Sequence, residues 1–230
     1  MKRACLLIVG VLFTSMGWSQ TMNIHYKDGQ TVEYNMDNID YVEFTEKKQN
    51  NAQVSSGKAI DLGLSVKWAS YNVGATSPEQ YGELYAWGET VTKERFTISN
   101  YPYYDSYTES YIDIGHDIKG TNYDVAHVKW GGDWRMPTYE ELKELKKKCD
   151  WKWSRFNDVN GYIVTGPNGN SIFFPVGSNT IVLWASTRRD YDGVVSGTSD
   201  ALFFSKGTYN YMNSGRAREQ GCYVRPVMPL

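Results

Sequence analysis

The chain has 230 residues, a length that suits one domain of ordinary size with a short appendage. Its residues are 41% hydrophobic and 15% aromatic, a composition that excludes an intrinsically disordered chain. The formal net charge is -2, which argues against nucleic acid or anionic lipid as a partner.

The first 19 residues are predicted to be a secretory signal peptide. A basic pair precedes an apolar run over residues 4–13, and the small residues Gly17 and Ser19 suit cleavage before Gln20. The apolar run is shorter than the roughly 20 residues that a membrane span needs. We therefore expect an exported protein, secreted, periplasmic or on the cell surface, with no membrane span after removal of the signal.

Residues 20–45 are predicted to form a small β-hairpin unit, because apolar and polar residues alternate on both sides of a turn sequence. A two-residue loop would place apolar residues opposite polar ones. A three-residue loop instead pairs Tyr26 with Val32 and Ile24 with Tyr34, so that one face becomes apolar, and we favour that register.

A third short strand is expected at residues 41–44. The resulting unit has little core, so it is expected to pack on the main domain, on a partner or on another copy of itself. Residues 46–58 are polar and without periodicity, which predicts a linker, and residues 59–230 are predicted to form the main domain.

The main domain is predicted to consist largely of short strands. In one hairpin a five-residue loop pairs Val164 with Ile172 and Tyr162 with Phe174 on a single face. A tyrosine-rich, irregular excursion is expected over residues 95–123. The expected strands are 59–64, 66–70, 83–88, 161–165, 171–174, 181–186, 201–204, 208–212 and 223–227, and the tryptophans expected in the core are Trp68, Trp87, Trp134 and Trp184.

One helix is strongly indicated after Pro137, and a short helical turn is expected within residues 123–130. Thr138 suits the N-cap, and Glu141 lies three residues later, where its carboxylate can reach back to the cap amide. The helix is expected to bury one face, composed of Tyr139, Leu142, Leu145 and Cys149.

Several ordered motifs resemble those of the Fibrobacter succinogenes major paralogous domain family. They lie at residues 59–69, 85–89, 130–138, 160–162 with 166–173, 184–186 and 224–227. The resemblance covers about residues 59–230 and implies an α+β, C-type-lectin-like domain with short strands and few helices, in which the terminal strands pair and long loops form a ligand face. The N-terminal unit resembles short β segments that precede such domains in secreted proteins of gut Bacteroidetes.

Cys149 and Cys222 remain after export, in a compartment that permits disulfides. They are either a bridged pair or two separately buried thiols, because spacing alone does not fix pairing. In lectin-like domains a disulfide often joins an early helix to the last strand, so the resemblance favours the bridge modestly.

An enzymatic function is not expected. The helix start at Trp134–Glu141 also resembles that of formylglycine-generating enzymes, but those enzymes use a nearby cysteine pair, and the spacing of Cys149 and Cys222 does not carry over. The histidines lack metal-binding spacing, so we expect neither a metal nor a cofactor. The oxygen-rich stretches 157–161 and 190–193 are interpreted as turns rather than calcium loops.

What the sequence offers instead is a candidate recognition surface, since Tyr, Asn and Arg are enriched at binding faces. The alternative is that the tyrosines merely pack on a sheet.

Two functions are compatible with these observations. We expect an exported, non-enzymatic protein that recognises a glycan or protein ligand, or else a structural or adhesive surface component that self-associates through the N-terminal unit. The candidate ligand-binding residues are Arg188, Arg189, Tyr191, Tyr209, Tyr211, Asn213 and Arg216.

Overall fold

The computed structural model divides the chain into two compact units, residues 1–50 and 51–230. It describes residues 21–25, 30–38, 57–177, 180–190 and 194–230, and for residues 24–25 and 208–214 it describes the backbone alone. The predicted signal peptide, the predicted third strand at 41–44 and all but the last two residues of the predicted linker lie outside these ranges.

The first unit contains an antiparallel pair of strands, β1 (Thr21–His25) and β2 (Thr31–Asn35), followed by a 3-10 turn, η1 (Met36–Asn38). The predicted register was wrong by two residues, because Ile24 lies opposite Val32 rather than Tyr34. The predicted pairing of Tyr26 lies outside the described residues. A shift of two keeps the same residues on each face, since side chains alternate with period 2.

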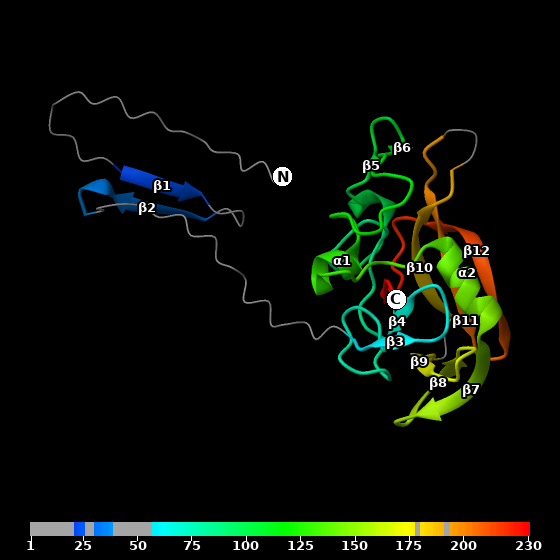
Figure 1. Cartoon of the computed structure of the whole chain (residues 1–230). Helices are drawn as coiled ribbons and strands as arrows, with labels where there is room; N and C mark the ends of the chain where they lie inside the picture. The colour runs from blue at the N-terminus through cyan, green and yellow to red at the C-terminus, as the bar shows by residue number, and fades with distance from the viewer. Residues whose placement is uncertain (1–20, 26–29, 39–56, 178–179, 191–193) are drawn as a thin grey trace. The chain divides into compact units, whose positions relative to one another are not determined.

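The second unit is an α+β domain built from small antiparallel sheets and two short α-helices in its described part (Figure 1). The helices are α1 (Val125–Trp130) and α2 (Tyr139–Lys148), with a 3-10 turn η2 (Ile98–Asn100). The strands of the sheets, in spatial order, are β10 (Ile181–Arg188), β11 (Thr198–Ser205) and β12 (Thr208–Ala217); β7 (Asp150–Phe156), β8 (Val159–Thr165) and β9 (Ser171–Pro175); β13 (Val227–Met228), β4 (Lys67–Ala69) and β3 (Ala59–Asp61); and β5 (Tyr104–Asp105) with β6 (Ser110–Tyr111).

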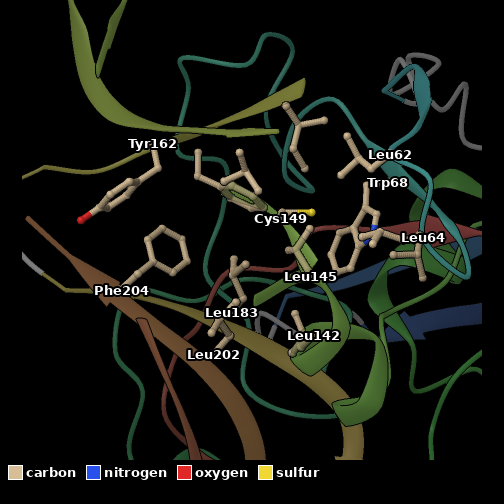
Figure 2. Packing of buried hydrophobic residues seen from close by; sticks show 14 of the residues in the cluster. Leu62, Leu64, Trp68, Leu142, Leu145, Cys149, Tyr162, Leu183, Leu202 and Phe204 are labelled. Atoms are coloured by element: carbon tan, nitrogen blue, oxygen red, sulfur yellow. The ribbon is translucent and has the colours of Figure 1, made fainter. Parts of the chain in front are cut away.

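The sheet β10–β11–β12 has a hydrophobic cluster on each face. Leu183 and Leu202 contribute to the cluster that includes α2, β4 and β8, and Figure 2 shows their side chains converging with Leu142, Leu145 and Trp68. The neighbouring residues Val182, Trp184, Ala201 and Phe203 contribute instead to a second cluster with α1 and the segment before β13. This alternation is the period-2 pattern of a strand that is buried on both faces.

Helix α2 was predicted correctly. Thr138 and Glu141 form the capping box, and Leu142 and Leu145 are fully buried. The helix start is also tied to the preceding segment, because Arg135 donates from its two terminal nitrogens to the Glu141 carboxylate at 2.8 and 2.6 Å. The short helix α1 begins after Asp124, whose buried carboxylate accepts from the amides of Ala126 and His127.

The β8–β9 hairpin confirms the predicted register, with Val164 opposite Ile172 and Tyr162 opposite Phe174. Strand β7 was not predicted. It joins β8 through a two-residue turn at Asn157 and Asp158, whose φ values of 44° and 64° are tolerated best by Asn, Asp and Gly. Two predicted strands are irregular: within 83–88 Tyr85 makes a single bridge with Cys222, and within 223–227 only Val227 belongs to a regular strand.

All four tryptophans expected in the core are buried there. The indole Nε1 of Trp87 donates to the carbonyl of Ala185 at 3.0 Å, and that of Trp184 donates to the carbonyl of Tyr85 at 2.8 Å. Each of these two indoles thus donates to the segment that carries the other, as buried indoles usually do, whereas Nε1 of Trp68 has no partner among the described residues.

The tyrosine-rich excursion is anchored on Arg218, which is fully buried. Its guanidinium lies over the rings of Trp87 at 4.8 Å and Tyr111 at 5.3 Å, and its Nε donates to Tyr101 Oη at 3.1 Å. Cation–π contacts of this kind become stronger when the groups are shielded from water. The excursion is therefore held against the domain at Tyr101 and Tyr111, while most of its residues are exposed.

The two cysteines are free thiols, so the disulfide that the resemblance favoured does not form in this structure. Cys149 ends α2 within the first hydrophobic cluster and Cys222 lies in the second, which places them in different parts of the core. Burial raises the pKa of Cys149 to about 11 and that of Cys222 to about 12. Both side chains are consequently protonated at neutral pH.

Over the residues that the structure describes, none of the helices has the length and apolar character required to cross a membrane.

Candidate ligand-binding site

A pocket of about 360 Å³ opens where β10 ends and α2 begins, and we call it the α2–β10 pocket. It combines residues from four segments that are distant in sequence. Its lining consists of His116, Thr138, Tyr139, Glu140, Thr187, Arg188, Arg189, Asp190 and Asp200.

Backbone contacts hold the start of α2 against β10. The amide of Ser186 donates to the carbonyl of Pro137 at 2.7 Å, and the amide of Tyr139 donates to Thr187 Oγ1 at 3.2 Å. Farther along the same edge of β10, the amide of Arg188 donates to the carbonyl of His116 at 2.8 Å. The pocket wall is therefore fixed by regular elements, which position a site more firmly than free loops do.

Arg188 lies in the pocket wall but its guanidinium is already occupied. The side chain is 4% exposed, and it donates to both oxygens of Asp190 at 2.6 and 2.7 Å and to Asp113 at 2.8 Å. The hydrogen bonds from Arg188 hold the pKa of Asp190 below its ordinary value. Arg188 thus orders the chain after β10, and this placement differs from the exposed arginine that the sequence analysis expected.

Among the described side chains that line the pocket, Arg188 and Asp200 are less than a tenth exposed, and Asp200, on β11, has the fewer hydrogen bonds. It is 7% exposed, and the hydrogen bond it receives from the described residues is a long one, 3.3 Å from Thr187 Oγ1. Burial raises its pKa, while Thr187 and the charges of Arg189 and His116 act in the opposite direction. A carboxylate with unused acceptor positions therefore faces the pocket.

The rim carries exposed polar side chains of both signs. Arg189, His116 and Glu140 are exposed, and Tyr139 is half-buried with the Lys143 ammonium 5.3 Å from its ring centre. Within the described ranges no group of three or more His, Cys, Asp or Glu side chains is arranged to hold a metal ion. The described groups are suited to hydrogen bonding with a polar ligand.

The structure does not gather all of the predicted ligand-binding residues into one described site. Arg188 and Arg189 line the α2–β10 pocket, whereas Arg216, on β12, lines a separate pocket. Tyr191 lies outside the described residues, and for Tyr209, Tyr211 and Asn213 only the backbone of β12 is described.

His116, Tyr139 and Asp200 were missed as site residues by the sequence analysis. Asp200 carries the one recognisable signal, since an acidic residue directly precedes the apolar run 201–204 of a strand that proves to be buried. His116 and Tyr139 reach the pocket through long-range packing. No family model, curated protein or solved structure matches the chain.

Proposed function

We propose that the protein is an exported, non-enzymatic binding protein that recognises a glycan in the α2–β10 pocket. We also propose that its second unit is a C-type-lectin-like domain of the major paralogous family. The motifs located above support this assignment, and so does the sheet that joins the two ends of the domain, in which the last strand, β13, pairs with β4 and β4 pairs with the first strand, β3.

The state of Asp200 carries the functional proposal. An ionised carboxylate in a buried position is costly unless it is paired or fully hydrogen-bonded. Asp200 has a single long hydrogen bond from Thr187 among the described contacts, and it opens onto a pocket rather than onto a packed core. A ligand that donates hydrogen bonds to the Asp200 carboxylate would explain why the chain keeps an acidic residue in this buried position.

A hydroxyl-rich ligand fits the remaining groups best. Sugar hydroxyls donate to a carboxylate such as Asp200 and accept from a guanidinium such as Arg189, so one ring can use both. The pocket brings together both charge signs, which favours a neutral ligand with many donors and acceptors.

The test is a glycan array probed with the mature chain and with Asp200→Asn. The variant keeps the shape of the side chain but replaces one acceptor oxygen by a donor, so we expect binding to the array to fall at least tenfold. Asp158→Asn, on the exposed β7–β8 turn, is the matched control and should leave the array profile unchanged. Equal profiles for wild type and Asp200→Asn, or no bound glycan at all, would contradict the proposal.

One observation favours a second function, self-association through the first unit. Val32 and Tyr34 on β2 are 37% and 39% exposed, and a two-stranded sheet alone is marginally stable in water. Under this alternative the mature chain grows in size with concentration in sedimentation experiments, and Val32→Lys abolishes that growth. A chain that stays monomeric at every concentration removes this alternative.

A further inference from the structure

A second pocket, of about 340 Å³, lies beside the start of β10, and we call it the Arg216 pocket. Its lining includes Tyr81, Leu84, Ile181, Val182, Arg216 and Tyr223. The rings of Tyr81 and Tyr223 lie side by side, with centres 6.3 Å apart and planes inclined by 36°. The pocket therefore offers aromatic faces, apolar side chains and one cationic group.

The guanidinium of Arg216 distinguishes this pocket. Its Nε atom is buried and has no hydrogen-bond partner among the described residues. A buried donor without a partner costs about 1–3 kcal/mol and is uncommon in folded proteins. Five other buried side-chain atoms of the described residues share this state, and of the six only Nε of Arg216 belongs to a residue that lines either pocket named here.

The other arginines packed into this domain show the contrast. Arg188 donates to carboxylates, Arg218 to Tyr101 and to backbone carbonyls, and Arg225 to Asn72 and to backbone carbonyls. None of the described residues that line the Arg216 pocket is an aspartate or a glutamate. The described partner of the Arg216 side chain is the thiol of its neighbour Cys222, which is a weak acceptor and leaves Nε unpaired.

We propose that the Arg216 pocket binds an acidic sugar, a uronic acid unit, as a site separate from the α2–β10 pocket. The carboxylate of the sugar pairs with the guanidinium and takes the hydrogen bond of Nε, in the geometry that favours arginine for carboxylates. The pyranose ring lies against the Tyr81 and Tyr223 rings, whose hydroxyls can bond its hydroxyl groups. This proposal does not depend on the glycan proposed for the other pocket.

Isothermal titration of the mature chain with glucuronate and with glucose tests the inference. We expect glucuronate to bind at least tenfold more tightly than glucose, and its affinity to fall as salt rises, because the preference comes from one charge pair. Arg216→Gln should abolish the preference for glucuronate. Arg155→Gln, which changes an exposed arginine on β7, should retain it.

A second variant protects the test against a folding defect. Tyr81→Phe keeps the ring but removes the hydroxyl, and it should weaken glucuronate binding while leaving the thermal unfolding midpoint near that of wild type. Equal affinity for glucuronate and glucose, or an unchanged preference in a folded Arg216→Gln, would overturn the proposal. Asp200→Asn should leave glucuronate binding intact, so the two proposed sites fail or succeed independently.

Discussion

The Nε atom of Arg225 donates a 2.7 Å hydrogen bond to Oδ1 of Asn72, although 153 positions separate the two residues in the sequence. The guanidinium also donates to the carbonyls of Ala69 and Phe173, and it lies 4.1 Å from the ring centre of Phe174. One fully buried side chain thus joins the beginning, the middle and the end of the second unit.

Replacement of Arg225 by Met is expected to destabilise the protein strongly. The methionine fills most of the space but leaves three buried oxygens without their donor, and each unsatisfied group costs about 1–3 kcal/mol. The free energy of unfolding, measured by urea titration, should fall by about 3 kcal/mol or more. Arg155→Met is the control, because that arginine is 65% exposed and pairs with an exposed Asp158, so the change should stay within about 0.5 kcal/mol. Similar losses for the two variants would contradict the role assigned to Arg225.

Local signals explain which elements could be predicted from the sequence. The cap at Thr138, the turn around Pro167 and the alternation from Tyr162 to Phe174 each lie within a few residues, and each is confirmed. Strand β7 also alternates Trp151 and Trp153 with polar residues, but it follows the helix without a turn signal and was missed. The bond between Arg225 and Asn72 has no local signal at all.

The α2–β10 pocket was only partly predictable for the same reason. Arg189 was found because it belongs to a polar cluster in the sequence. Asp200 and Tyr139 meet it through the pairing of β10 with β11 and the packing of α2 on both strands, and His116 meets it through the bridge between Asp117 and Thr187. The burial of Arg188 was also unpredictable, since it depends on Asp113, 75 positions earlier.

The carboxylate of Glu141 is expected to make α2 sensitive to acid. Burial opposes ionisation, but hydrogen bonds from Arg135 and from the Thr138 amide prevail and lower the pKa of Glu141. A lowered pKa means that this stabilisation is complete above the unfolded value of about 4.3 and is lost as the pH falls through the lower, folded value. Glu141→Gln should therefore lose about 1.5–3 kcal/mol at pH 7 and show a smaller further loss below pH 4 than wild type.

Glu140→Gln provides the control for this prediction, because the Glu140 carboxylate is 72% exposed and forms an ion pair with Lys143 on the helix surface. Its unfolding free energy should change by less than about 0.5 kcal/mol. The role of Glu141 would be refuted if both glutamine variants unfolded at the same urea concentration at pH 7.

Gly166 is expected to tolerate no side chain. A Cβ there would lie 2.0 Å from the carbonyl oxygen of Leu62, and that backbone cannot move without disturbing the first hydrophobic cluster. Gly166→Ala should cost about 2–3 kcal/mol in thermal or urea unfolding. Gly207→Ala tests the backbone alone, since φ is 72° there but the space around it is open, and it should cost about 1 kcal/mol. A smaller loss at Gly166 than at Gly207 would show that the Leu62 segment yields easily.

Asp200→Asn is expected to leave the protein as stable as wild type, or more stable, at neutral pH. Burial raises the pKa of Asp200, so the folded state holds the proton more tightly than the unfolded state does. The stability of wild type consequently falls as pH rises from the unfolded value of about 3.9 through the folded one, and the asparagine lacks this dependence. The charges of Arg189 and His116 lower the pKa of Asp200 and that of Glu140 raises it, and the net shift stays upward.

Urea titrations at pH 4, 6 and 8 check this prediction. The free energy of unfolding of Asp200→Asn, relative to that of wild type, should increase with pH, whereas that of Asp158→Asn should stay constant across the series. A variant that is less stable than wild type by 1 kcal/mol or more at pH 8 would mean that the carboxylate holds the fold together, and the reason for assigning it to a ligand would disappear.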